Sequence, residues 1–411
     1  MISSTIDIAW RNLGRNRRRT ALALTAIAVA QLALLVMDGL MHGYTDAMID
    51  AMTGPMLGHA QVHAPEWREE RAMDLVLEGV DATVAELAGM EGVERVSPRL
   101  YAPALAALGE DGHTVVVVGL DATVESGPGG MLAAVPARAR PRGRQALVGR
   151  QLARKMGVSP GDEIAIVGQA ADGSIANDLF VVSGVFSSPV DLVNRLGIVV
   201  PLATAQDTFA MPDQAHEITI RGNNAEGAEA LAAAAARLPE LRGAEVLPWQ
   251  QLAPELITVI ELSDASSAIV LLLVFVAAAA GVANTMLMAT FERTQELGML
   301  LALGTTPRRI VRMIVAEAIA LGLAGVAVGT VLGTGAVLVF AGTGFDFGAL
   351  GNEAVGDLSF GGLNYGLRIY PRIEAADIFT GVWAVVVTAL LASLWPAIHA
   401  ARLEPVKALR S

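Results

Sequence analysis

The sequence predicts a polytopic α-helical membrane protein with four transmembrane helices and a large α+β extracytoplasmic domain of two lobes inserted between helices 1 and 2. The first observation behind this prediction is composition. The 411 residues are 53% hydrophobic and 17% charged, too apolar for an ordinary soluble protein and too charged for a chain that lies wholly in lipid. The other two are a set of long apolar stretches and a gathering of arginines beside them.

Four apolar stretches are long enough to cross about 30 Å of hydrocarbon, which takes about 20 helical residues. They are residues 20–42, 266–290, 311–341 and 376–398. The first could be mistaken for a signal peptide, but its apolar run is too long and no convincing small-residue cleavage site follows Gln31 and Asp38. We therefore expect a retained first transmembrane helix.

Arginine placement predicts the orientation in the membrane. Residues 1–19, 291–312 and 396–411 carry an excess of arginine and lysine, and such segments lie on the cytoplasmic side. Both termini are therefore expected on the cytoplasmic side of the membrane. The acidic segment 43–265 and the loop 342–375 are expected in the periplasm or outside the cell.

The N-terminal segment 1–19 is predicted to be an amphipathic helix along the inner membrane surface. Ile6, Trp10 and Leu13 share one helical face, and the flanking arginines suit the headgroup region.

The large segment 43–265 alternates short strand and helix patterns, which indicates an α+β domain. The stretch PARARPRGR, residues 136–144, is a plausible subdomain boundary because proline and glycine interrupt regular structure. We expect an inserted β-rich lobe at about 145–212. The flanking pieces 57–135 and 213–248 would form a second lobe.

A stalk is predicted where this domain leads into the second transmembrane helix. Leu252, Leu256, Val259 and Ile260 fall on one helical stripe. Such a stripe suits packing against a partner helix, although an ordinary juxtamembrane helix would show it too.

Enzyme signatures give no support for catalysis by this chain. Neither of the two lysines, Lys155 and Lys407, ends a Gly-x-x-x-x-Gly-Lys-Ser/Thr loop, so no phosphate-binding P-loop is present. GVSPG around Ser159 matches Gly-x-Ser-x-Gly by letter, but a helix precedes the serine where a strand is required. His59 and His63 lie on a strand pattern without a third ligand. We expect no catalytic residue, metal or cofactor in this chain, and no nucleic-acid partner.

Two ionisable residues, Asp38 and Glu317, lie within apolar stretches, where charges are by default candidates for function. Asp38 is near the outer end of its helix, within reach of water. Glu317 is expected to face other helices and to pair with a nearby arginine. Gly325, Gly329 and Gly333 recur every four residues and form a seam for close helix packing, within the chain or between subunits.

The segment 291–310, FERTQELGMLLALGTTPRRI, is polar although apolar stretches flank it on both sides. On a helix over 290–303, one stripe carries Glu292, Glu296, Met299 and Leu303, and the opposite side carries Thr290, Leu297 and Leu301. Gly304 suits a C-terminal residue with positive φ, and Thr306 with Pro307 suits the start of a new helix. The segment is predicted to be a rigid cytoplasmic projection continuous with the second transmembrane helix.

Several segments share the motifs of one membrane-protein family. They are ERTQELGMLLALG (292–304), AWRNLGRNRRRT (9–20), LVGRQLARKMGVSPGDEIAIV (147–167), AEAIALGLAGVAVGTVLG (316–333) and WPAIHAARLEPVKALRS (395–411). Together they resemble the FtsX-like permeases of ABC transporters, the group that contains the lipoprotein-releasing and MacB-type permeases. GHAQVHAPEW (58–67), with Trp249 and Pro254, looks most like the lipoprotein-releasing members.

The resemblance implies a permease that pairs with a second permease subunit, as homodimer or heterodimer, and with two copies of a separate ATPase that binds ATP and magnesium. It implies that the projection is the coupling helix held by the ATPase. The residues concerned would be Glu292, Arg293, Glu296, Leu297, Gly298, Leu303 and Gly304.

The expected function is mechanotransmission, in which ATP-driven movement of the coupling helix reshapes the extracytoplasmic domain and extracts or exports lipoprotein, lipid or other hydrophobic cargo. Membrane lipids and a periplasmic partner are further expected contacts. Two alternatives remain open: a non-transporting switch that activates an extracytoplasmic partner such as a cell-wall hydrolase, and a receptor or scaffold without an ATPase.

Overall fold

The computed structural model describes residues 17–346, 359–360, 363–364 and 368–402. Most of the predicted N-terminal amphipathic helix, much of the loop 342–375 and most of the tail 399–411 lie outside the described residues. The chain divides into two compact units. The helical unit comprises residues 1–45, 259–347 and 368–411, and the sheet unit comprises residues 46–258 and 348–367.

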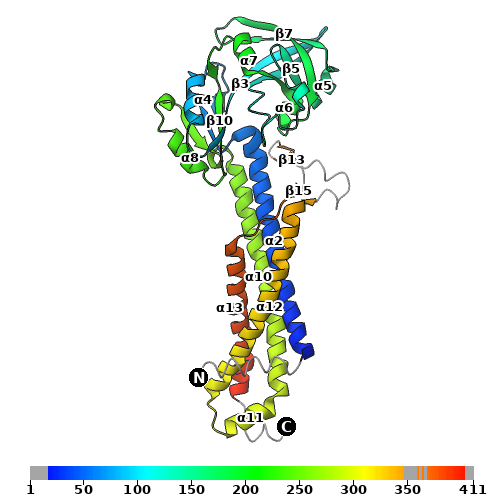
Figure 1. Cartoon of the computed structure of the whole chain (residues 1–411), viewed down its shortest axis with the longest axis vertical. Helices are drawn as coiled ribbons and strands as arrows, with labels where there is room; N and C mark the ends of the chain where they lie inside the picture. The colour runs from blue at the N-terminus through cyan, green and yellow to red at the C-terminus, as the bar shows by residue number, and fades with distance from the viewer. Residues whose placement is uncertain (1–16, 347–358, 361–362, 365–367, 403–411) are drawn as a thin grey trace. The chain divides into compact units, whose positions relative to one another are not determined.

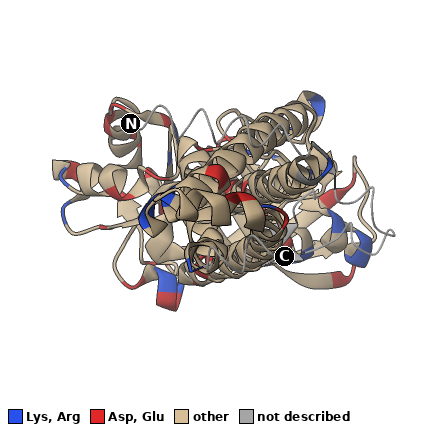
Figure 2. Cartoon of the chain, turned by 90° about the horizontal axis from the view of Figure 1, so that it is seen from below, with Lys and Arg blue, Asp and Glu red and all other residues tan. Residues whose placement is uncertain are grey.

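Four described helices are long and apolar enough to cross a membrane, and they contain the four predicted stretches. They are α2 (Arg17–Met52), α10 (Pro254–Glu292), α12 (Pro307–Thr343) and α13 (Ala375–Ala401) (Figure 1). Their turns are drawn largely in the colour of uncharged residues (Figure 2). The boundary between the two units falls within α2 and within α10, so both helices contribute residues to each unit.

The predicted glycine seam of α12 packs within this chain, against α2. A Cβ atom added to Gly325 would lie 2.7 Å from Ile27 Cβ, and one added to Gly329 would lie 2.5 Å from Ala28 O. At Gly333 the nearest atom would be Leu35 Cβ at 3.1 Å. Glycine therefore allows the two helix backbones to approach closely, as small residues do in membrane helices.

Gln31 is a polar residue in the interior of this bundle, which the sequence analysis did not single out. Its side chain is buried, and Nε2 lies 3.4 Å from Thr330 Oγ1 on α12. On α13, a Cβ added to Gly381 would lie 2.5 Å from the same Nε2. Gln31 therefore contacts two other helices of the bundle, in the manner of interhelical polar residues in membranes.

The sheet unit contains eleven strands among residues 46–258. They are β1 (Ala60–His63), β2 (Leu77–Glu78), β3 (Val93–Leu108), β4 (Asp111–Leu120), β5 (Gln145–Gly149), β6 (Glu163–Gln169), β7 (Ile175–Phe186), β8 (Gly197–Pro201), β9 (Gln214–Ala215), β10 (Glu217–Gly222) and β11 (Glu245–Pro248). Nine of them form one sheet in the order β11-β1-β10-β3-β4-β8-β5-β7-β6, and β2 pairs with β9.

Short helices connect and cover these strands. They are η1, a π-helix (Thr53–Leu57), α3 (Trp67–Glu70), α4 (Val80–Ala88), α5 (Arg150–Met156), α6 (Asp191–Leu196), α7 (Leu202–Thr208), α8 (Ala228–Ala235), α9 (Trp249–Leu252) and two 3-10 turns (Ala137–Ala139 and Pro239–Leu241). Outside residues 46–258, β12 (Phe345–Asp346) pairs with β15 (Arg368–Ile369), and β13 (Ser359–Phe360) pairs with β14 (Leu363–Asn364).

The sheet is open at one end and closed at the other. The long strand β3 also pairs with β6, through Ala104–Ala107, so β3, β4, β8, β5, β7 and β6 form a closed ring of strands. β11, β1 and β10 extend the first half of β3 as an open sheet. The β-rich lobe expected at about 145–212 therefore also takes in β4 and the second half of β3. Long-range pairing of β4 with β8 and of β3 with β6 sets this boundary.

Arg99 marks the point where β3 passes from the open sheet into the ring. It pairs with Glu217 of β10 on one side and with Leu120 of β4 on the other. The arginine side chain is fully buried, and its Nη2 lies 2.6 Å from Oε1 of the equally buried Glu125. A buried charge needs such a partner because desolvation of an isolated ion is costly.

Glu125 is held as a carboxylate by several donors. Burial alone would raise the pKa of Glu125, but Arg99 and the donors around it hold that pKa below its usual value. Met131 N–H donates to Oε2 over 2.9 Å, and Ser97 Oγ donates to Oε1 over 2.7 Å. The loop that carries Glu125 is therefore fastened to β3.

The buried polar network around Arg99 extends to Tyr101, Glu217 and His216. Tyr101 donates its hydroxyl to Glu217 Oε1 over 2.8 Å, and its backbone N–H donates to His216 Nδ1 over 3.0 Å. The imidazole ring of His216 stacks on Trp67, with ring centroids 5.8 Å apart. Burial lowers the pKa of His216 to about 4, so the ring is neutral at neutral pH.

We expect Gly329→Ala to destabilise the helical unit, because its methyl group would collide with Ala28 O at 2.5 Å. Overpacking of this kind typically costs about 1–3 kcal/mol. Gly335→Ala is the matched control, since nothing lies within 4 Å of a Cβ on that glycine of the same helix. Thermal unfolding in detergent should give a lower Tm for Gly329→Ala and an equal or higher Tm for Gly335→Ala. Equal behaviour of the two variants would contradict the packing of the seam.

We expect acid to weaken the sheet unit through His216. Its pKa is about 4 when folded and near 6.5 when unfolded, so the unfolded chain binds more protons between these values and stability falls as the pH drops from 6.5 to 4. Each unit of pKa difference corresponds to about 1.4 kcal/mol. His216→Asn removes the titration and should flatten the pH dependence of denaturant unfolding followed by tryptophan fluorescence. Parallel curves for the variant and the parent protein would refute this role.

Candidate functional site

The helical unit contains a short helix between α10 and α12, in the segment that the sequence analysis singled out (Figure 1). α10 ends at Glu292, and α11 (Thr294–Ala302) follows after Arg293, whose φ of −108° and ψ of 15° depart from the helix. The predicted single helix over 290–303 is therefore interrupted. Thr294 explains the break, since its Oγ1 donates to Phe291 O over 2.8 Å and competes for a helical carbonyl.

Arg293 connects this break to α11 and to α12. Its Nε lies 3.2 Å from Glu296 Oε2, and its Nη1 lies 3.2 Å from Glu317 Oε2. Glu317 is buried on α12, so the arginine neutralises a carboxylate that would otherwise be unfavourable in an apolar environment. The arginine partner expected for Glu317 is thus Arg293.

One face of α11 packs into the protein. Leu297 is 3% exposed and forms a cluster with residues of α12 and α13. The cluster consists of Leu297, Ile310, Ile314, Ala397 and Ala400. The neighbouring Gly298 is also buried. Leu297 was expected to contact the ATPase and Gly298 to permit its close approach, and both are buried within this chain.

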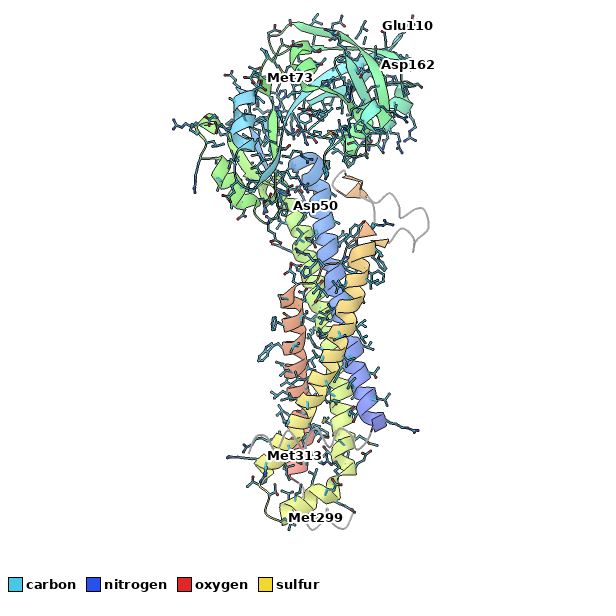
Figure 3. The ribbon with its side chains drawn as sticks, in the orientation of Figure 1. Asp50, Met73, Glu110, Asp162, Met299 and Met313 are labelled. Carbon is cyan, nitrogen blue, oxygen red and sulfur yellow. The ribbon has the colours of Figure 1, made fainter. Side chains whose placement is uncertain are left out.

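The opposite face of α11 is open. Met299 is 53% exposed and Leu303 is 77% exposed, and Met299 is labelled on α11 in Figure 3. Glu292 is exposed at the end of α10, and Glu296 is partly exposed. The face predicted from the helical period therefore carries exposed apolar and acidic side chains together.

A tight turn with left-handed glycine ends α11. Gly304 has φ of 87°, as predicted. Thr305 N–H donates to Leu300 O and Gly304 N–H donates to Leu301 O, each over 3.0 Å, which is the Schellman arrangement. Thr306 precedes Pro307, the first residue of α12. The turn fixes the direction in which the chain leaves α11.

Arginines of the sheet unit form hydrogen bonds with the last turn of α2 and with η1, which follows it. Three arginines of β3 and β10, which we call the arginine clamp, each donate a hydrogen bond to α2 or η1. The bonds are Arg95 Nη2 to Gly54 O over 3.0 Å, Arg99 Nη1 to Met56 O over 2.7 Å and Arg221 Nη2 to Asp50 Oδ1 over 3.2 Å. Carbonyl groups at a helix C-terminus lack helical partners and carry partial negative charge, so cations suit this position.

Glycines allow the loop after β4 to pack closely against η1. A Cβ on Gly54 would lie 2.7 Å from Gly129 O, and one on Gly130 would lie 2.1 Å from Glu125 O. Sequence reasoning missed the clamp and this loop. The cluster Gly127-Pro128-Gly129-Gly130 was a visible signal of an unusual loop, but nothing in it identifies the arginines that it meets.

The predicted stalk stripe is interrupted in the structure. Leu252 lies on α9, Ala253 is not helical, with φ of −134° and ψ of 69°, and α10 begins at Pro254. A residue before proline avoids the helical conformation because its backbone clashes with the proline ring. Arg68 Nη2 donates to Leu252 O over 2.8 Å, and Trp249 Nε1 donates to Ala225 O over 2.9 Å. α9 is therefore anchored inside the sheet unit.

The remaining stripe residues lie on the first turns of α10. Leu256 is buried, and Val259 and Ile260 are partly buried. The unit boundary passes between Thr258 and Val259.

The remaining candidates lie in helices, strands and turns of the described part of the chain. Asp38 is partly buried on α2, one turn before His42, whose Nε2 lies 3.3 Å from Asp377 Oδ1. His59 Nδ1 accepts from Gly222 N–H over 3.1 Å. Ser159 lies in the turn between α5 and β6. Among the described residues, no cluster of three or more metal-ligating side chains occurs.

Similarity to known proteins extends over parts of the chain. The chain is 33% identical over 136 residues to the pyoverdine export ATP-binding/permease protein PvdT of Pseudomonas putida. This match covers 32% of this chain and 16% of that protein. The periplasmic region of MacB from Actinobacillus actinomycetemcomitans matches with 12% identity and a TM-score of 0.34, covering 48% of this chain and 91% of that one. The extracellular domain of the ABC-type transporter YknZ from Gram-positive bacteria matches with 16% identity and a TM-score of 0.32, and the match covers 46% of this chain and 98% of that one.

Family models account for most of the sequence. The MacB-like periplasmic core domain matches residues 20–240, and the C-terminal part of FtsX-like permeases matches residues 268–405. The narrower likeness to lipoprotein-releasing permeases stays a prediction. The two matches follow one another along the chain and include most residues of each of the four long helices. The chain therefore belongs to the MacB/FtsX-like permeases of ABC transporters.

Proposed function

We propose that this chain is a permease subunit that couples ATP hydrolysis in a separate ATPase to a conformational change of its periplasmic domain, and so extracts or exports lipoprotein, lipid or other hydrophobic cargo. The observation that carries the proposal is α11. It presents exposed Met299 and Leu303 beside acidic side chains, while Leu297 holds its other face inside the protein. A partner protein can bind such a face, because apolar side chains anchor an interface and the charged side chains beside them add specific contacts.

Force applied to α11 would be passed on because α11 cannot move alone. The Arg293 side chain bonds to both Glu296 and Glu317, and the Leu297 cluster ties α11 to α12 and α13. Packed interiors resist deformation. A displacement of α11 would therefore shift the helices as a set.

The arginine clamp would receive this movement in the periplasmic domain. α2 contributes residues to both units. Arg221 bonds to its last turn, and Arg95 and Arg99 bond to η1, which follows directly. Arg99 is also the residue at which the open sheet meets the ring of strands. A tilt or shift of α2 would thus act on the junction between the two parts of the sheet.

The proposed assembly contains two copies of the ATPase and a second permease subunit, in a bacterial inner membrane with both termini cytoplasmic. ATP and magnesium would be bound by the ATPase. Lipid would surround apolar side chains that are exposed on the long helices, such as Leu272 and Leu273. Export is favoured over a purely regulatory role by the name of the Pseudomonas putida relative, a pyoverdine export protein.

We expect the double substitution Met299→Glu and Leu303→Glu to weaken ATPase binding at least about tenfold, or about 1.4 kcal/mol. Both side chains are exposed, so the fold should persist while the apolar contact is lost. The measurement is affinity between the purified variant and the ABC ATPase that copurifies with the tagged parent chain, identified by mass spectrometry.

Met299→Leu with Leu303→Met is the matched control, since it keeps the face apolar, and it should bind as the parent chain does. Unchanged binding by the glutamate variant, or failure of any ABC ATPase to copurify with the parent chain, would rule out the coupling assignment.

We expect Asp50→Lys to uncouple the periplasmic domain from the ATPase. Asp50 is 64% exposed and accepts from Arg221, so a lysine there repels the clamp without disturbing a core. ATP hydrolysis should persist, whereas the ATP-dependent change in amide hydrogen exchange of η1 and β3 should largely disappear. Glu110→Lys, the same charge reversal in the exposed turn between β3 and β4, is the control and should behave as the parent. An unaltered exchange response in Asp50→Lys would remove the clamp from the transmission route.

A further inference from the structure

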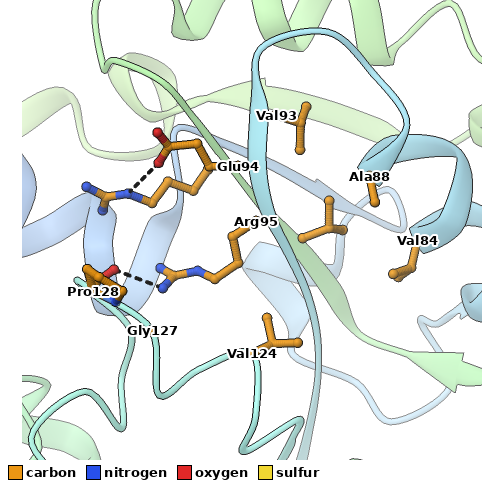
Figure 4. A pocket seen from close by; sticks show the side chains of 10 residues that line it. Val84, Ala88, Val93, Glu94, Arg95, Val124, Gly127 and Pro128 are labelled. Carbon is orange, nitrogen blue, oxygen red and sulfur yellow. Dashed lines mark hydrogen bonds and ion pairs between the residues drawn. The ribbon is translucent and has the colours of Figure 1, made fainter.

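A cavity of about 570 Å³ opens in the sheet unit beside the arginine clamp (Figure 4). Its lining comes from α4, β3, β10 and the loop after β4. The residues are Val84, Ala88, Val93, Glu94, Arg95, Val96, Val124, Gly127, Pro128 and Arg221. Ligand pockets in proteins usually measure about 300–1,000 Å³, so this one has the size for a small molecule.

The cavity exists because the first half of β3 has a strand partner on one side only. Residues Val93–Arg99 pair with β10, whereas pairing with β4 begins at Arg99. Among the described residues, no strand pairs with the other side of 93–98. The loop that contains Val124 and Pro128 lies across this edge instead, and leaves space between itself and α4.

Most of the cavity wall is apolar. Val84 and Ala88 face it from α4, Val93 and Val96 from β3, and Val124 from the loop. Apolar groups that enter it would leave water, which is favourable in proportion to the area buried. The wall therefore suits a hydrocarbon chain better than a polar metabolite.

Arg95 supplies a positive charge at one side of this wall. Its hydrogen-bond acceptors include backbone carbonyls. Nη1 donates to Pro128 O over 3.1 Å (Figure 4), and Nη2 donates to Gly54 O over 3.0 Å. Among the described residues, no carboxylate lies within 4.0 Å of Arg95, whereas Arg221 lies 3.9 Å from Glu94 and 3.2 Å from Asp50. Arg95 is thus the guanidinium whose charge is not neutralised at short range, and a guanidinium binds carboxylates and phosphates well.

We propose that this cavity binds an anionic amphiphile, with its carboxylate or phosphate on Arg95 and its hydrocarbon chain against the valines of α4, β3 and the loop. Charge complementarity selects an anion, and the apolar wall selects a chain over a compact ion. A fatty acid and an acidic phospholipid share this chemistry.

Occupancy would affect the end of α2. Arg95 donates to Gly54 O in η1, and a bound anion would compete for the same guanidinium. The amphiphile would therefore loosen one of the three bonds of the clamp. This consequence rests on the proposed coupling function, whereas the binding itself does not.

The test uses the full chain in lipid nanodiscs. The chain contains no cysteine, so Ala88→Cys, at an exposed position in the cavity wall, can be labelled with an environment-sensitive fluorophore. Octanoate and octyl phosphate are the probes, and octanol and octyltrimethylammonium are the comparators. We expect a saturable fluorescence change with the two anions, and an affinity at least about tenfold weaker for the comparators, because they lack a charged hydrogen bond to arginine. Tighter binding of octanoate would indicate a fatty-acid ligand, and tighter binding of octyl phosphate would indicate a phospholipid ligand.

Two controls make the result specific. The same label on Ser174→Cys, an exposed turn position, should not respond. Arg95→Gln should lose the preference for anions while Arg138→Gln, at an exposed arginine away from the cavity, keeps it. Equal affinity for octanol or octyltrimethylammonium, an equal response at position 174, unchanged binding in Arg95→Gln, or no saturable response would each overturn the proposal. Since no ATPase is present, none of these outcomes bears on the coupling function.

Discussion

The buried ion pair between Arg99 and Glu125 is the interaction on which the sheet unit depends. Arg99 lies where β3 leaves the open sheet and joins the ring, and Glu125 fastens the loop after β4 to that point. The same guanidinium donates to Met56 O in η1, directly after α2. One buried charge thus joins two parts of a sheet, a loop and a helix end. Removal of either partner would leave an uncompensated ion in the interior, which typically costs about 3–5 kcal/mol.

The helical unit contains a comparable arginine–glutamate ion pair, between Arg293 and Glu317. Arg293 occupies the break between α10 and α11 and reaches the buried Glu317 on α12. In both units an arginine side chain contacts the region where a long helix ends, and a carboxylate from another segment of the chain neutralises it. Ends of helices leave backbone groups unsatisfied, so they are natural places for charged side chains to bind. In the proposed function, these two regions are where a movement would enter the permease and where it would reach the periplasmic domain.

Sequence alone determined the features that depend on local pattern. Length and apolarity located the four long helices, because a helix must be about 20 residues long to cross a bilayer. The helical period placed Met299 and Leu303 on one stripe and Leu297 on the opposite side, and the structure shows that the first stripe is exposed and Leu297 is buried. Gly304 was predicted at the turn because few other residues adopt a φ of 87° at low cost.

Tertiary structure alone decided which distant residues meet. Leu297 looked like a contact for a partner until its packing against α12 and α13 was known. The lobe boundary was misplaced because β3 closes the ring by pairing with β6, more than fifty residues further along the chain. The glycine seam could have served either subunit packing or internal packing, and only the contact with α2 settles it. The arginine clamp was invisible because each of its bonds joins residues that neither period nor motif relates, and such long-range pairing is a property of the folded chain.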